Sequence, residues 1–230
     1  MTLTAPRTLE VEVYDASLCK HGEELCGDKV RVVRSPEKTV VALSDGLGSG
    51  VKANILATLT ATIAVTMLRA DVRLDDVVET IVETLPVCKV RHVAYATFTL
   101  VEVRADGRCR IVNFDNPPVF FFRAGRPREL PWRDVVSHGR TLHVADLTLR
   151  AGDFVGAISD GVVHAGVGIR LNLGWGWQNV SRHLEGACIR HPAGARGIVQ
   201  SVMNRTQELY GGMPGDDATF VGLYVRAAAS

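Results

Sequence analysis

The order of the predicted elements indicates an α+β fold. Strands come first along the chain, followed by two adjacent helices, a run of strands, two more adjacent helices and a final strand. This order differs from the regular alternation of strand and helix in parallel α/β folds. The 230 residues contain no linker rich in Pro, Gly or Ser, so we expect a single domain over residues 1–230.

Three strands and two helices are predicted in the first part of the chain. The strands lie at 9–14, 29–34 and 38–44, and the turn Ser35-Pro36 separates the last two. A helix is predicted from about Ser49 to Arg69, and a second at 74–85, which should end at Pro86. In the first helix, apolar residues at every fourth position are expected to face the core, and two leucines widen this stripe: Val51, Ile55, Leu59, Ile63 and Met67, with Leu56 and Leu68.

A period of two returns after the second helix. Asp106-Gly107 is a strong hairpin signal between the first two of five predicted strands, at 93–103, 108–114, 119–122, 141–149 and 153–158. Residues 161–174 are expected to form a loop. Two helices follow at about 177–188 and 193–210, and the last strand begins after Asp217.

The composition is that of an ordinary soluble globular protein. Hydrophobic residues make up 47% and charged residues 22%, and the net charge of +1 gives no basis for binding nucleic acid. The uncharged stretch 53–68 contains threonines and is shorter than the roughly 20 residues that a bilayer span needs. A buried helix is therefore expected there, and no membrane association.

The cysteines favour a reducing, cytoplasmic setting. None of the five belongs to a Cys-x-x-Cys pair, and the N-terminus shows no signal-peptide pattern. Cys19, His21 and Cys26 do not follow a zinc-binding spacing and lack a fourth ligand, so we expect ordinary loop residues.

Four predicted strands carry an acid at one end: Asp28, Asp45, Asp160 and Asp216. Carboxylates gathered at rigid strand ends repel one another unless they are protonated or neutralised by a cation. Oxygen ligands suit hard ions such as Mg²⁺ or Mn²⁺. Two such ions, about 3.5–4 Å apart, would support hydrolysis of phosphate esters.

Simpler explanations exist for these segments. Asp-Gly is a common turn dipeptide, so each tip taken alone is also typical of a turn, and only its recurrence at strand ends favours metal ligands. The glycines Gly46, Gly48 and Gly50 before a helix could suggest a nucleotide loop, but their spacing fits neither the dinucleotide-binding nor the P-loop pattern.

Three motifs together carry a family resemblance. They are Ser44-Asp45-Gly46-Leu47-Gly48-Ser49-Gly50 before a long helix, Ser159-Asp160-Gly161 after a strand, and Gly215-Asp216-Asp217-Ala218-Thr219 before the last strand. In this order they resemble the metal-dependent PPM (PP2C-like) protein phosphatases, and most closely the bacterial sporulation stage II E and sigma-B-regulator branch. The resemblance extends over about residues 10–225. It implies an α/β/β/α four-layer sandwich, in which helix pairs flank a central antiparallel β-sandwich.

The resemblance also implies roles at two bound Mn²⁺ or Mg²⁺ ions, with Asp45, Asp160 and Asp216 as the catalytic carboxylates. Asp45 would bridge both ions and the Gly46 carbonyl would bind one of them, while Asp160 and Asp216 would hold the other. Asp28 would bind the first ion directly or through water. Asp217 would bind a metal-bound water or position its neighbour.

Some positions depart from the family pattern. Leu47 replaces a histidine that protonates the leaving group in eukaryotic members, so the implied general acid is a metal-bound water. The segment Asp115-Asn116-Pro117-Pro118-Val119 is similar to the family's Asn-Ala-Gly-His-x-Pro-Pro but lacks the alanine, glycine and histidine. Candidates for binding the substrate phosphate, by position alone, are Lys20, Lys29 and Arg31. Five histidines are expected to lie away from the acids, as surface or packing residues: His138, His143, His164, His183 and His191.

The function implied by the resemblance is that of a metal-dependent phosphoserine/phosphothreonine protein phosphatase acting through a metal-bridging hydroxide. The usual substrate in this branch is a phosphorylated STAS-domain protein, such as an anti-anti-sigma factor or a stressosome scaffold. The length of the chain is similar to that of the stand-alone phosphatase of the sigma-B pathway. Two alternatives stay open: a non-catalytic PPM-like module that binds a phosphoprotein, and a small-molecule phosphohydrolase that uses the same ions.

Overall fold

A computed structural model describes residues 9–84, 96–191 and 194–228. One sheet contains β1 (Leu9–Leu18), β6 (Phe120–Arg123), β7 (Arg126–Pro127), β10 (Phe154–Ile158) and β11 (Ala218–Ala227). The other contains β2 (Asp28–Arg34), β3 (Lys38–Gly46), β4 (Ala96–Arg104), β5 (Arg108–Phe114), β8 (Trp132–Ser137) and β9 (Arg140–Thr148). The helices are α1 (Gly50–Arg69), α2 (Leu74–Thr84), α3 (Asp160–Val163), α4 (Trp177–Arg190) and α5 (Ala195–Leu209).

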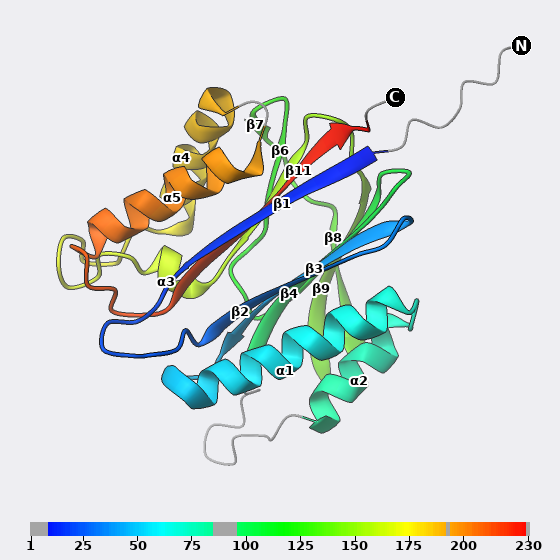
Figure 1. The fold of residues 1–230 in the computed structure, drawn as a ribbon, viewed down its shortest axis with the longest axis horizontal. Helices are drawn as coiled ribbons and strands as arrows, with labels where there is room; N and C mark the ends of the chain where they lie inside the picture. The colour runs from blue at the N-terminus through cyan, green and yellow to red at the C-terminus, as the bar shows by residue number, and fades with distance from the viewer. Residues whose placement is uncertain (1–8, 85–95, 192–193, 229–230) are drawn as a thin grey trace, which may run out of the picture.

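The two sheets face each other at the centre of the molecule. Their strand orders are β1-β11-β10-β6-β7 and β2-β3-β4-β5-β9-β8, and the strand pairs are antiparallel. Figure 1 shows α4 and α5 outside the first sheet, and α1 and α2 outside the second. The α+β class and the four-layer α/β/β/α sandwich are therefore confirmed.

Strand β3 shows how the sequence builds these layers. Val41 and Leu43 point into the core between the sheets, whereas Val40 and Ala42 point into the core beneath α1. Because both faces of β3 are buried, its sequence is a continuous apolar run instead of an alternating one. Full burial of each large apolar side chain contributes about 1.5–3 kcal/mol relative to exposure.

The predicted buried face of α1 is wrong for its first half. Val51, Ile55 and Leu59 are 58%, 53% and 41% exposed. The buried face consists mainly of small residues: Gly50, Ala53, Leu56, Ala57, Thr60, Ala61, Ala64, Val65 and Leu68. Small side chains let the helix approach β3 so closely that a Cβ on Gly46 would lie 2.2 Å from the Ala53 carbonyl oxygen. Close backbone approach, and not the largest side chains, therefore selects the buried face.

By length and composition, helix α1 is long and apolar enough to cross a membrane, and 39% of its most apolar stretch is buried in this structure. Its buried face packs against the sheet within the same core as Val40 and Phe98. The expected buried helix is therefore found on one face only, and the face that carries Val51, Ile55 and Leu59 is exposed.

Other boundaries shift for local reasons. Strand β8 was not predicted, because half of its residues are exposed and its apolar residues do not alternate with polar ones. Helix α3, with four residues, is too short to show a periodic pattern. Strand β1 continues to Leu18 because it pairs with β11 along its whole length. The predictions for residues 85–95 and 193 lie outside the described residues.

Candidate metal centre

The four predicted acids meet at one end of the β-sandwich. Asp28 begins β2 and is the direct cross-strand partner of Asp45 at the end of β3. Asp160 follows β10, and Asp216 precedes β11. β10 and β11 are antiparallel neighbours in the sheet that faces the sheet of β2 and β3. The antiparallel pairings thus bring residues from four distant parts of the chain to one edge.

Burial and the negative charges of the neighbouring acids raise the pKa values of three of these carboxyl groups. Burial, reinforced by the charges of Asp28, Asp160 and Asp216, raises the pKa of Asp45 to about 9. Burial also raises the pKa of Asp28 to about 7, and the charge of Asp160 adds to this effect. Burial and the Asp160 charge raise the pKa of Asp216 above its usual value. Such a cluster is unfavourable in its fully ionised form unless a cation compensates it.

Asp28 provides a direct test of whether a cation fits. Its side chain is 3% exposed, and its Oδ2 accepts a hydrogen bond of 2.7 Å from the Ser159 hydroxyl. Its Oδ1 is buried and has no hydrogen-bond partner among the described residues. A buried carboxylate oxygen without a partner is costly, and a hard cation bound to it would remove that cost.

Ser159 is a residue of the centre that the sequence reasoning missed. Besides donating to Asp28, its Oγ accepts a hydrogen bond of 2.9 Å from the Thr219 backbone N–H. Both Ser159 and Ser44, the serines of the two Ser-Asp-Gly tips, are fully buried. The recurrence of serine before each acid was the available signal, because a hydroxyl at a buried strand end must have a partner.

The glycine after each acid is explained by close packing and not by turn geometry. A Cβ on Gly161 would lie 2.0 Å from the Asp217 carbonyl oxygen, and the corresponding contact at Gly46 is with α1. Neither glycine has a positive φ. The turn explanation of the two Asp-Gly pairs is therefore wrong, because Gly46 ends a strand and Gly161 lies within α3.

Asp217 fixes the loop that approaches the centre. Its side chain is 4% exposed, and its two oxygens accept hydrogen bonds of 2.9 Å each from the backbone N–H groups of Lys20 and Gly27. The Asp217 N–H in turn donates to Asp216 Oδ1 at 3.0 Å. Asp217 thus ties the loop between β1 and β2 to the segment that carries Asp216. Its role towards a metal ion stays a prediction.

Two further residues, His164 and Lys20, lie close to the acids. His164 was expected to lie far away, but its Nδ1 is 3.9 Å from Asp160 Oδ2. The expectation overlooked that α3 places the residue four positions after Asp160 on the same face. Among the candidate phosphate-binding cations, Lys20 lies close enough to Asp216 for its charge to oppose, in part, the rise in pKa that burial causes at that carboxyl.

The partial match around Asn116 also lies beside the centre. Thr97, the cross-strand partner of Asp45, donates a hydrogen bond of 2.5 Å to Asn116 Oδ1. Asn113 Nδ2 donates to the Pro117 carbonyl at 2.9 Å. This segment therefore braces β4 next to Asp45.

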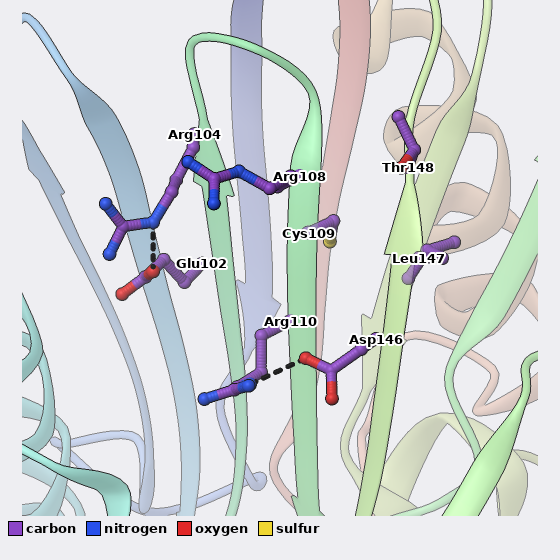
Figure 2. Close-up of a pocket in the computed structure, with 8 residues that line it drawn as sticks. All are labelled: Glu102, Arg104, Arg108, Cys109, Arg110, Asp146, Leu147 and Thr148. Carbon is purple, nitrogen blue, oxygen red and sulfur yellow. Dashed lines mark hydrogen bonds and ion pairs between the residues drawn. The ribbon is translucent and has the colours of Figure 1, made fainter.

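The opposite end of the second sheet offers different chemistry. A hollow of about 620 Å³ lies over β4, β5 and β9, and Arg104, Arg108 and Arg110 project into it (Figure 2). Each of these arginines is already paired with an acid, respectively Glu102, Asp106 and Asp146. The hollow is therefore lined by compensated charges and lies far along the strands from Asp45, since Arg104 pairs with Lys38 at the other end of β3.

Comparison with known proteins agrees with this fold. The family model described as Stage II sporulation protein E (SpoIIE) matches residues 35–226. No curated protein sequence matched the chain significantly. Among solved structures, the PP2C phosphatase domain of SpoIIE from Bacillus subtilis, with a fragment of its regulatory domain, is 20% identical with a TM-score of 0.79. That match covers 97% of this chain and 65% of the other.

Two other solved structures are similar. The RsbU and RsbW domains of a Mycobacterium tuberculosis protein match with a TM-score of 0.75 and 17% identity, covering 98% of this chain and 62% of that one. RsbX in complex with magnesium matches with a TM-score of 0.64 and 16% identity, covering 96% and 98%. The chain therefore spans just under two thirds of the first and second of these three structures and nearly all of the third.

The fold is that of PP2C-type phosphatase domains, which supports a metal-dependent protein phosphatase. Because the family model matches most of its length, the chain belongs to the SpoIIE family.

Proposed function

We propose that this protein hydrolyses phosphoserine or phosphothreonine in a regulatory protein, and that two Mn²⁺ or Mg²⁺ ions are bound by Asp28, Asp45, Asp160, Asp216 and the Gly46 carbonyl. The observation that supports this most directly is the buried Asp28 Oδ1, which has no hydrogen-bond partner among the described residues and lies in a cluster of mutually repelling carboxylates. The whole of residues 1–230 would act as one catalytic domain.

The residues of the chain would divide the work. Two ions, when bound, supply positive charge at the phosphate and an activated water for hydrolysis. Ser159 keeps Asp28 oriented through its 2.7 Å hydrogen bond. Lys20, held beside Asp216 by its backbone bond to Asp217, is placed to attract an anionic substrate.

The surface next to the centre supports a protein substrate over a small molecule. Leu47 directly follows the Asp45-Gly46 tip, and with Val51, Ile55 and Leu59 it forms an exposed apolar row along α1. Exposed apolar rows of this kind are typical of protein-binding surfaces. Because the row begins at the centre itself, its occupant would be the phosphorylated protein. We propose a STAS-domain protein as that substrate, and a cytoplasmic setting, on the basis of the family.

The proposal is tested by hydrolysis of an aryl phosphate across Mn²⁺ and Mg²⁺ titrations. Asp45→Asn and Asp160→Asn should each lower activity at least about a hundredfold, since they remove groups that act on the reacting phosphate. Asp134→Asn is the matched control, because Asp134 is an exposed acid of β8 paired with His143. A chelator should abolish activity.

The alternative of a non-catalytic module leads to a different result. If the parent protein is inert at every ion concentration yet binds a phosphoprotein, the catalytic proposal fails and the binding module replaces it. Turnover of small phosphate esters without turnover of any phosphoprotein would instead favour a small-molecule phosphohydrolase.

A further inference from the structure

The loop between β1 and β2 brings two cysteines together beside the acid cluster. β1 belongs to the first sheet and β2 to the second, so residues 19–27 cross from one sheet to the other. Cys19 directly follows β1, and Cys26 lies two residues before β2. Both cysteines are free thiols.

Asp217 holds the two ends of this loop next to each other. Its carboxylate accepts hydrogen bonds from the backbone N–H groups of Lys20 and Gly27. Lys20 directly follows Cys19, and Gly27 directly follows Cys26. The contact is close, because a Cβ on Gly27 would lie 2.7 Å from Asp217 Oδ2. One carboxylate therefore holds the backbone next to both cysteines close together.

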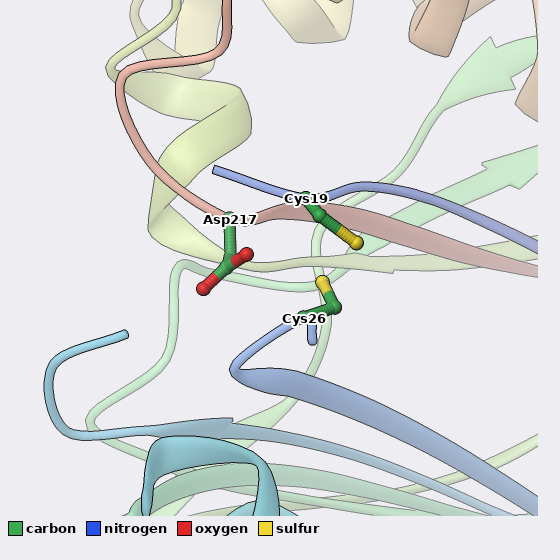
Figure 3. Close-up of side chains that lie close together, drawn as sticks. All are labelled: Cys19, Cys26 and Asp217. Carbon is green, nitrogen blue, oxygen red and sulfur yellow. The ribbon is translucent and has the colours of Figure 1, made fainter. Parts of the chain in front are cut away.

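Three possible ligand atoms converge as a result. The sulfur atoms of Cys19 and Cys26 and one oxygen of Asp217 all lie within 4.8 Å of one another. Figure 3 shows the two sulfur atoms facing each other, with the Asp217 carboxylate beside them. The sequence pattern lacked this carboxylate, which is contributed from the far end of the chain.

We propose that Cys19, Cys26 and Asp217 form a site for a thiophilic divalent cation of the zinc class, separate in chemistry from the Mn²⁺ or Mg²⁺ centre. Thiolate sulfur is a preferred ligand of Zn²⁺ and a poor one for hard ions. Tetrahedral coordination with Zn–S bonds of about 2.3 Å puts two sulfurs roughly 3.8 Å apart. Because the two sulfurs already lie within 4.8 Å of each other, they need to approach by about 1 Å at most. Cys19 is exposed and free to make that adjustment.

The coordination is chemically complete without any redox step. The cation replaces the proton of each thiol, two protons leave to solvent, and the two thiolates and one carboxylate oxygen bind the ion. Each Asp217 oxygen already accepts one N–H and has a further lone pair for the cation. Water fills the fourth position on the exposed side of Cys19.

The site would stabilise the loop that leads into Asp28. A cation bound to Cys19 and Cys26 closes the base of the loop a second time, in addition to the two hydrogen bonds to Asp217. Because Asp217 is also bonded to Asp216 through its N–H, the cation would be coupled to the acid cluster through one residue.

The decisive experiment is a Cd²⁺ titration of the reduced full-length protein in excess Mg²⁺, followed by the thiolate-to-metal charge-transfer absorption in the ultraviolet. We expect one equivalent to bind with this absorption. Cys19→Ser and Cys26→Ser should each weaken binding by more than about tenfold, since each removes a ligand. Cys188→Ala is the control, because Cys188 is buried on α4, and it should bind as the parent protein does.

Three results would overturn the proposal. They are absence of the charge-transfer band in the parent protein, an unchanged band in Cys19→Ser, and a disulfide between Cys19 and Cys26 that forms in place of Cd²⁺ binding. Cys19→Ser is the stringent variant, because the exposed side chain contributes little to folding. Asp45→Asn should keep the band while losing hydrolysis, so failure of this site and failure of the phosphatase proposal are distinguishable.

Discussion

Replacing Ser159 by alanine tests how the acid cluster is held together. The substitution removes the hydrogen bond to Asp28 Oδ2 and leaves the Thr219 N–H without its side-chain acceptor. A hydrogen bond to a charged group contributes about 1.5–3 kcal/mol, and an unsatisfied buried N–H costs about 1–3 kcal/mol. Both Ser159 and Thr219 are fully buried, so water cannot compensate. We expect the free energy of unfolding to fall by about 3 kcal/mol.

The same substitution should weaken metal binding. The Ser159 bond lowers the pKa of Asp28, opposing the effect of burial. Without this bond the pKa of Asp28 is higher and its side chain is no longer held in one orientation. Metal binding must then displace the proton of Asp28 and fix its side chain, and both requirements reduce the affinity. Loss of a residue that orients a ligand typically lowers metal affinity about 10–100-fold. The Mn²⁺ midpoint for aryl phosphate hydrolysis, measured at saturating substrate, reports this change directly.

Ser44→Ala is the matched control for Ser159→Ala. Ser44 is equally buried and precedes the other Asp-Gly tip, but its Oγ donates to the Thr97 carbonyl at 3.0 Å and not to a carboxylate. It should cost about 1 kcal/mol of stability and leave the Mn²⁺ midpoint unchanged. An identical Mn²⁺ midpoint in Ser159→Ala and the parent protein would refute the orienting role of Ser159.

The remaining predictions concern pH, packing and the substrate surface. Burial and neighbouring acids raise the pKa of Asp45 in the folded protein from 3.8 to about 9, so the folded state binds more protons than the unfolded state in this range. The metal-free protein should therefore lose stability as the pH rises from about 4 to 9. Thermal unfolding in the presence of a chelator checks this, and a Tm that rises with pH across that window would contradict it. Added Mn²⁺ should reverse the loss at pH 8, and Asp45→Asn should flatten the profile. In Gly161→Ala the new methyl carbon would lie 2.0 Å from a backbone oxygen, so the free energy of unfolding should fall by about 1–3 kcal/mol. In Gly194→Ala the nearest contact is 3.5 Å, and the loss should be less than about 1 kcal/mol. Equal losses in denaturant unfolding would contradict the packing argument. Ile55→Glu should lower kcat/KM for a phosphoprotein about tenfold and leave hydrolysis of an aryl phosphate unchanged. Ile189 on α4 is similarly exposed, so Ile189→Glu should change neither activity. A parallel loss on both substrates in Ile55→Glu would exclude a docking role for the α1 row.

Local signals in the sequence were sufficient for the fold class and for the acid tips. Apolar periodicity marks elements whose buried faces are regular, and for β3 and α2 it predicted both the type and the extent closely. The acids could be found because each stands where an apolar strand meets a glycine, a pattern that is visible within a few residues. From these signals the family resemblance, and with it the layered sandwich, followed.

Other features depended on residues far apart in the chain, and only the tertiary structure decided them. The buried face of α1 follows from how closely its backbone approaches Gly46, which a count of large apolar residues does not measure. The role of Ser159 depends on a partner 131 positions away, and the meeting of Cys19, Cys26 and Asp217 depends on the pairing of β1 with β11. Sequence periodicity records which side of an element is apolar, whereas distances between elements are determined by packing and strand register. For this reason the acids at the strand ends could be located from the sequence, but the contacts that hold them in place could not.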